Sequence, residues 1–229
     1  MVIIKIFPIG LISATSDTGI LDSIVYDFFE PNNGCSDNYQ FDILTSMFQN
    51  RIMLTRKKSE KTLVIEYRFE NILDREFRQI EHFIESVDES LTPFWIIDFS
   101  KGQTPDSIAN SSGDWLVSIK NTRLFSIIAN QKAHRVFIKW GKSWKEGTVV
   151  TISTNSSIVV DVDTNNYGNL SLANANLHAM IYPMYEVYVM QNSLANLKTT
   201  VYIPESININ QSGGWMRSGS LSFVSKYKV

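Results

Sequence analysis

The side chains best suited to chemistry are a single cysteine and three histidines. Cys35 lies in the run Pro-Asn-Asn-Gly-Cys-Ser-Asp, which is typical of a loop. A cysteine nucleophile needs a histidine beside it, and the candidates His82, His134 and His178 are about fifty residues apart along the chain. Their spacing gives neither a His-x3-His pair nor an HExxH motif, so no zinc site is predicted. We expect no catalytic residues, no metal and no cofactor, and an enzyme is the third of three interpretations.

A second candidate is a run of oxygen-bearing side chains. Asp161, Asp163 and Asn165 occupy alternate positions, which is how a calcium-binding loop begins. The pattern then departs from an EF-hand, because the glycine, Gly168, stands eighth instead of sixth and the twelfth residue is Leu172 instead of glutamate. The sequence therefore favours a polar strand end that runs into a turn.

Five tryptophans raise the possibility of sugar binding, since sugar rings stack on flat aromatic side chains. Trp95 and Trp115 lie in apolar segments and are expected to fill the core. Trp144 lies between Lys142 and Lys145, which makes it the best candidate for an exposed ring and for an interface residue. The alternative function is accordingly a carbohydrate-binding module for attachment to a host surface.

The charge balance limits the partners. The chain has 21 basic and 23 acidic residues and a net charge of -2, which gives no basic field for nucleic-acid phosphates. The run Arg56, Lys57 and Lys58 is too short to bind nucleic acid alone, and we expect a solvated turn, a guard against stray edge pairing or a contact with a neighbouring chain. Residues 1–8 are too short an apolar run to span a membrane. We predict no specific nucleic-acid partner and no membrane insertion.

The clearest elements are a strand, a helix and a second strand. Apolar and polar residues alternate over residues 62–70, which predicts a half-buried strand. Apolar residues then recur at spacings of three and four, which predicts a helix at about 74–88, and a proline separates it from a short apolar strand at 94–99. The residues assigned to packing between helix and sheet are Phe77, Ile80, Ile84 and Trp95.

The middle of the chain begins with a linker-like stretch. Residues 101–113 are rich in Gly, Ser, Asn, Pro and Gln, a composition that favours an unstructured loop, and this loop is a further candidate for contacts with neighbours. Short strand candidates follow at a spacing that suits a small sandwich or barrel. They are residues 115–119, 124–128, 136–140, 148–153 and 158–162. A hairpin turn is predicted at Asn155-Ser156.

Three alternating segments close the sequence, at residues 185–191, 197–203 and 215–227. Long strands need partners, and we expect these to return to the sheet begun by residues 62–70.

The predicted fold class is mainly β (α+β): an antiparallel sheet or split barrel with one packed α-helix, plus a small inserted β subdomain. Residues 1–100 and 183–229 form the main β domain. Residues 101–182 form the loop and the inserted subdomain.

The stretch from Arg56 to Ser86, followed by Thr-Pro-Phe-Trp-Ile-Ile-Asp98, resembles the tail-tip proteins of long-tailed bacteriophages. In lambda-type minor tail proteins and their gene transfer agent relatives, an alternating strand leads to a helix of the form x-E-F-x-x-I-x-x-F and then to an aromatic-rich strand. The later order Gly113-Asp-Trp, Arg135-Val-Phe-Ile-Lys, Gly-Thr-Val-Val-Thr-Ile and Tyr-Glu-Val-Tyr-Val is also similar. The resemblance covers about half of the chain in pattern and little of it in identity.

The resemblance implies a structural protein related to distal tail proteins, without enzymatic residues. Copies would form a ring, with a hexamer as the expected copy number, and would connect the tail tube to baseplate hub proteins or the receptor-binding apparatus. The implied location is the virion tail, after assembly in the host cytoplasm. The candidate interface residues are Arg56, Lys57, Lys58 and Trp144.

Overall fold

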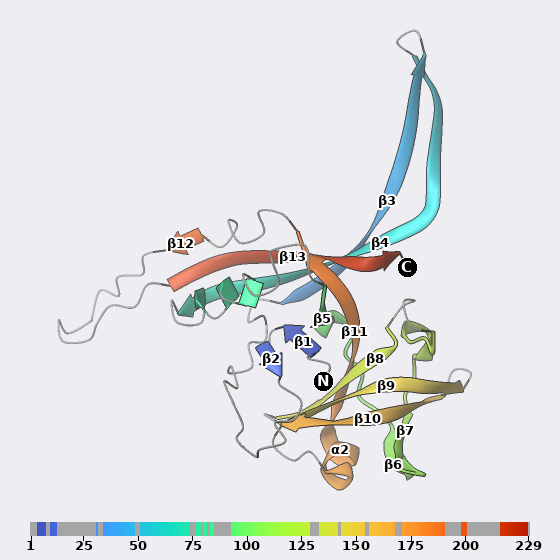
Figure 1. Cartoon of the computed structure of the whole chain (residues 1–229), viewed down its shortest axis with the longest axis vertical. Helices are drawn as coiled ribbons and strands as arrows, with labels where there is room; N and C mark the ends of the chain where they lie inside the picture. Colours follow the sequence, from blue (N-terminus) through green and yellow to red (C-terminus); the bar gives the residue numbers. More distant parts are fainter. Residues whose placement is uncertain are drawn as a thin grey trace, which may run out of the picture.

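The computed structural model describes most of the chain. It covers residues 4–7, 10–12, 31, 34–48, 51–73, 77–78, 80–81, 83–84, 93–128, 133–141, 143–153, 156–167, 171–190, 198–200 and 216–228. Strands dominate these residues, and nearly all of the pairings between them are antiparallel (Figure 1). The predicted mainly-β class is confirmed at that level.

The described elements occur along the chain in the following order. The early strands are β1 (Ile4–Phe7), β2 (Gly10–Ile12), β3 (Cys35–Phe48), β4 (Arg51–Leu73), β5 (Phe94–Ile97), β6 (Ser107–Ser111) and β7 (Asp114–Ser118). The later strands are β8 (Arg135–Trp140), β9 (Ser143–Ser153), β10 (Ser157–Tyr167), β11 (Met180–Val189), β12 (Lys198–Thr200) and β13 (Met216–Lys228). The structure also describes the 3-10 turns η1 (Phe99–Lys101) and η2 (Thr122–Leu124) and the helix α2 (Leu172–His178).

Strand β11 joins the two parts of the sheet. Its residues Met180–Met184 pair with β8, and β8 continues through β9, β10 and β7 to β6. Its residues Val187–Val189 pair with β13, and β13 pairs in turn with β4. Strands β5 and β11 pair with each other, and in Figure 1 the two groups of strands lie below and above this pair. The division into a main domain and an inserted subdomain stays a prediction.

Two pairings expected from the sequence are confirmed. The last strand returns to the one at residues 62–70, with Leu221 opposite Tyr67. The hairpin around Asn155-Ser156 is formed by β9 and β10, with Ser153 opposite Ser157.

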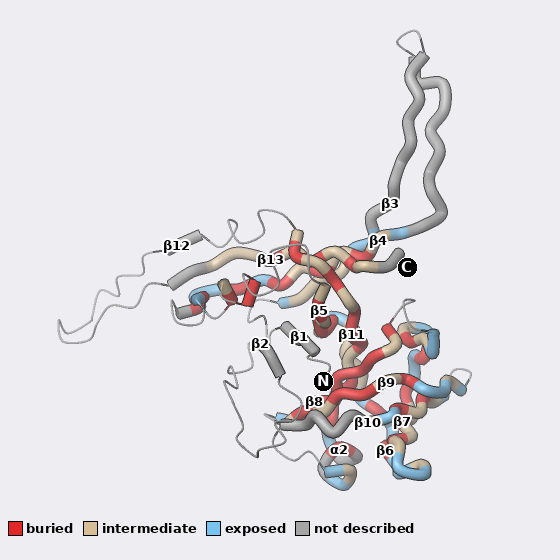
Figure 2. Tube along the Cα trace, in the orientation of Figure 1, coloured by how far each residue is buried: buried red, intermediate tan, exposed pale blue. Residues whose placement is uncertain are grey.

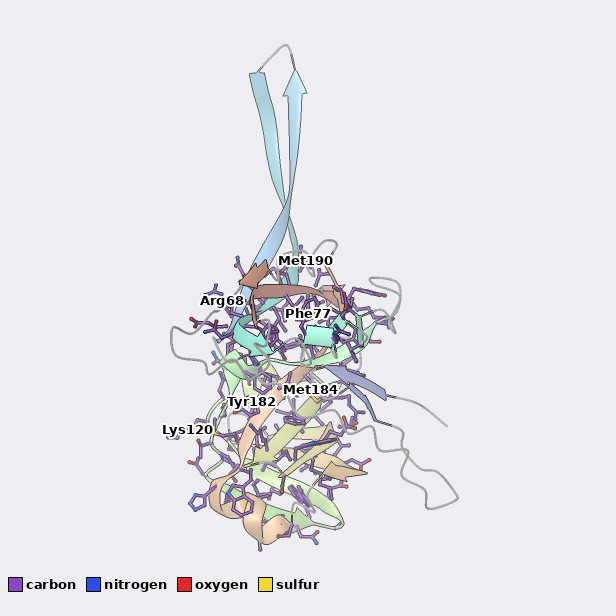
Figure 3. The ribbon with its side chains drawn as sticks, turned by 90° about the vertical axis from the view of Figure 1, so that its left-hand side faces the viewer. Arg68, Phe77, Lys120, Tyr182, Met184 and Met190 are labelled. Atoms are coloured by element: carbon purple, nitrogen blue, oxygen red, sulfur yellow. The ribbon has the colours of Figure 1, made fainter. Side chains whose placement is uncertain are left out.

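The core lies on both faces of β5, because successive side chains of a strand point to opposite faces. Phe94 and Ile96 join the large cluster, which also holds the inward side chains of β4 and β13. Ile97 joins a smaller cluster on the opposite face with Phe137 and Met184. Figure 2 shows buried residues in both groups of strands, and Figure 3 places Met184 on β11 below Phe77.

The helical residues Phe77, Ile80, Phe83 and Ile84 are buried in the large cluster. The ring of Phe83 meets that of Phe94 edge-on at a centroid distance of 5.1 Å, and Phe94 meets Phe223 in the same way at 5.8 Å. The ring of Phe83 thus contacts β5, and the packing of a whole helix on the sheet stays a prediction.

Two expectations for the middle of the chain are wrong. Residues 101–113 contain the ordered strand β6, because Ile108 is buried and the side chain of Gln103 exchanges two hydrogen bonds with the backbone of Asn121. Residues 124–128 do not form a strand, since η2 ends at Leu124 and Phe125 makes only an isolated bridge. Helix α2 was not expected.

Candidate functional site

The most distinctive surface feature is a long β-hairpin. Strands β3 and β4 pair along their whole shared length, from Cys35 opposite Tyr67 to Phe48 opposite Arg51. Strand β13 accompanies β4 only as far as Thr62. The hairpin beyond that point, residues 40–61, is named the arm, and Figure 1 shows it extending away from the other described strands.

The arm's backbone pairs only within the hairpin, among the strands that the structure describes. Eight residues of β3, from Phe41 to Phe48, span about 25 Å at the rise of an extended strand. A two-stranded ribbon is marginally stable in water, because it has little apolar surface to bury. The arm nevertheless contains many apolar residues. They are Phe41, Ile43, Leu44, Met47, Phe48, Ile52, Met53 and Leu54.

The basic run predicted as a turn lies in the arm instead. Lys57 is opposite Ile43 and Arg56 is opposite Leu44 in the ladder, and Lys58 follows in the same strand β4. The turn prediction is therefore wrong, because pairing with β3 extends this segment. The side chains of all three residues lie outside the described part, so their role as interface residues stays a prediction.

A polar cluster lies at the root of the arm. The Nζ atom of Lys101 is 3.0 Å from Oδ1 of Asp37, and Oγ of Ser100 is 3.1 Å from the same oxygen. The backbone N–H of Ser100 donates to Oδ1 of Asp98 over 3.0 Å, so Asp98 caps η1. The cluster thus connects β3 with the turn that follows β5.

Burial raises the pKa values of two groups in and beside this cluster, Asp98 and Cys35. Asp98 is fully buried, and its Oδ2 has no hydrogen-bond partner among the residues described here. Burial raises the pKa of the Asp98 carboxyl, and the negative charge of Asp37 raises it further. Burial also raises the pKa of the Cys35 thiol to about 12, with a second contribution from the charge of Asp98.

The candidates for nucleophilic chemistry do not come together in the described structure. Cys35 begins β3 instead of lying in a loop, and its Sγ is 3.8 Å from Oδ1 of Asp98. His134 stands edge-on to the ring of Trp95 at 5.1 Å, and burial lowers its pKa. His178 ends α2, and His82 lies outside the described residues. A thiol held protonated beside a carboxyl is a poor nucleophile.

The prediction of an exposed Trp144 is wrong. The ring is only 5% exposed and stacks on Phe137 at 5.5 Å between centroids. Alternation along β9 explains the error, because the flanking Lys145 belongs to the other face, where its Nζ lies 5.4 Å from the ring of Trp115. The sugar-binding interpretation loses the ring on which it depended.

Trp95 also differs from its assignment. It is half-buried beside the smaller cluster, on the face of β5 opposite to Phe94, and thus not on the face that packs against the helical segment. Phe77, Ile80 and Ile84 are buried in the large cluster, and their packing between helix and sheet stays a prediction.

A buried ion pair beside Trp95 was not predicted from the sequence. Arg135 on β8 lies 3.0 Å from Glu146 on β9, measured between Nη2 and Oε2, with the side chains 10% and 0% exposed. The guanidinium carbon of Arg135 also lies 5.5 Å from the centroid of the Trp95 ring. Arg135 and Glu146 are charged residues within a strand pairing, and only the register brings them together.

The calcium-like run belongs to strand β10, which includes residues 161–167. The strand part of the favoured interpretation is confirmed, and the turn expected after it lies outside the described residues. Within the described ranges, no three His, Cys, Asp or Glu residues are grouped so that they could hold a metal ion. The same residues include no helix of the length and apolarity that a membrane span requires.

No family model matches the chain, and no curated protein matches it.

Proposed function

We propose that the chain is a structural component of a bacteriophage tail tip or baseplate, whose copies assemble into a ring through the arm. The ring connects the tail tube to the baseplate or receptor-binding apparatus, and a hexamer is the proposed copy number. The observation that carries this proposal is the arm itself. A two-stranded ribbon rich in apolar residues gains most of its stability when a second surface covers it.

Charge supports a second copy of the chain as the partner. Residues 40–61 contain five of the 21 basic residues and two of the 23 acidic ones, so the arm has a net charge of +3. The remaining 16 basic and 21 acidic residues give the rest of the chain a net charge of -5. Opposite charges favour contact between the arm of one copy and the body of the next.

This geometry favours a ring over a simple dimer. A contact between an arm and a different surface of the neighbour is heterologous, and such contacts close into rings when the rotation between copies permits. The finer fold belongs to the same proposal: a helix at about 74–88 packed on the sheet and a small β subdomain inserted at residues 101–182. The burial of Phe77, Ile80 and Ile84 supports the first part.

The test compares the full chain with a variant that lacks the arm. Residues 42–60 are replaced by Asn-Gly, because Phe41 and Lys61 are opposite each other and can flank a two-residue turn. The control replaces residues 154–156 by the same turn between the paired Ser153 and Ser157. Negative-stain imaging should show rings for the full chain and the control. Rings that persist without the arm, or a full chain that stays monomeric, would overturn the proposal.

A further inference from the structure

We propose that Asp37, Ser100 and Lys101 form a clamp that fixes the root of the arm to the body and so sets the direction in which the arm is presented. These are positioning residues, because they act on the arm through the edge strand that carries it. The clamp joins β3 to η1, two segments that share no ladder.

The need for a clamp follows from the position of β3. Among the described strands it pairs with β4 alone, so its first residues form an edge that could separate from the sheet. The ladder is irregular where the arm leaves the body, since Phe41 is opposite Lys61 whereas Ile43 is opposite Lys57. Extra residues on one strand bend and twist a ribbon. The root on the body side of this bulge therefore determines where the arm points.

The contacts converge on one atom. Lys101 Nζ and Ser100 Oγ lie 3.0 Å and 3.1 Å from the same oxygen of Asp37, whose side chain is only 10% exposed. Partial burial reduces solvent screening, so this pair is stronger than an exposed one. Asp37 is thus held by a charge and by a hydroxyl that both belong to η1.

The hydroxyl of Ser100 has a second neighbour. Its Oγ is 2.5 Å from Oδ1 of Asp98, and one hydroxyl hydrogen can be donated to only one carboxyl group at a time. The same Oδ1 also accepts the backbone N–H of Ser100. Ser100 therefore links the buried carboxyl of Asp98 to Asp37 at the root of the arm.

Amide hydrogen exchange on the full chain tests the clamp. In Asp37→Asn and Lys101→Met, we expect the amides of residues 36–40 that donate to β4 to exchange about tenfold faster than in the wild type. The double variant should exchange no faster than either single one, because both remove the same contact. The amides of residues 221–224 on β13, which does not pair with β3, should be unchanged.

The matched control is Arg68→Gln. Arg68 pairs with Glu66 at 3.0 Å, but both residues lie on β4, so this ion pair cannot join the arm to the body. An Asp37→Asn variant that exchanges like the wild type at residues 36–40 would overturn the clamp. So would faster exchange that spreads equally to residues 221–224 of β13, since that means general destabilisation.

A second readout rests on the proposed function. If copies assemble through the arm, Lys101→Met should reduce the fraction of chains in rings at least severalfold. The melting temperature of Lys101→Met should be the same as that of the control Arg68→Gln. Hydrogen exchange does not depend on assembly. A monomeric wild type with a clamp-dependent root would therefore refute the ring and retain the clamp.

Discussion

The buried pair of Arg135 and Glu146 gives the sharpest stability prediction. Glu146 is 0% exposed, so Arg135→Met deprives a fully buried carboxylate of the cation 3.0 Å away. Breaking a buried ion pair by removing one partner costs about 3–5 kcal/mol of unfolding free energy. For a chain of this size, that corresponds to a fall of about 6–20 °C in melting temperature. Glu146→Leu should cost a similar amount.

The double variant shows how much of the loss comes from leaving one buried charge unpaired. Arg135→Met with Glu146→Leu removes both charges together and should unfold within about 1 kcal/mol of the wild type, or be more stable. Urea denaturation of the four proteins forms a complete double-mutant cycle. Lys226→Met is the control, since its pair with Glu186 is more exposed than that of Arg135 with Glu146 and should contribute less than about 1 kcal/mol. Single variants that cost less than this control, or single losses that simply add, would refute the reasoning.

Two further predictions concern close packing and a thiol. A Cβ on Gly147 would lie 2.5 Å from the carbonyl oxygen of Asp161, so Gly147→Ala should lower the unfolding free energy by about 1–3 kcal/mol. The exposed Thr151→Ala in the same strand should change it by less than about 0.5 kcal/mol, and equal losses in urea titrations would contradict the packing argument. Cys35, with a pKa of about 12, should react with iodoacetamide at pH 8 about a hundred to a thousand times more slowly than a free cysteine. The rate of this reaction should keep rising as the pH increases above 9. A rate that reaches a plateau near pH 9 would show that Cys35 has an ordinary pKa.

Local patterns predicted the parts of the fold that depend on local information. The alternation over residues 62–70 identified the buried face of β4, since period two is a property of the strand itself. The expected return of the last strand to this segment also holds. Asn155 and Ser156 marked a hairpin because turn chemistry is likewise local.

The features that sequence analysis missed depend on pairing at long range. Cys35 and the polar residues after it have low strand propensity, and they form β3 because β4 supplies a ladder. Trp144 was expected to be exposed because lysines surround it, but a strand register places neighbours on opposite faces. Asp37 and Lys101 meet only after β3 and β5 are positioned, so no spacing in the sequence could indicate their contact.

The mass of the assembled protein tests the central claim most directly. Sedimentation velocity of the full chain, over a hundredfold range of concentration, should show one closed oligomer whose size stops increasing. Replacement of residues 42–60 by Asn-Gly should convert it to a monomer with an unchanged melting temperature. A full chain that sediments as a monomer at every concentration would contradict the account.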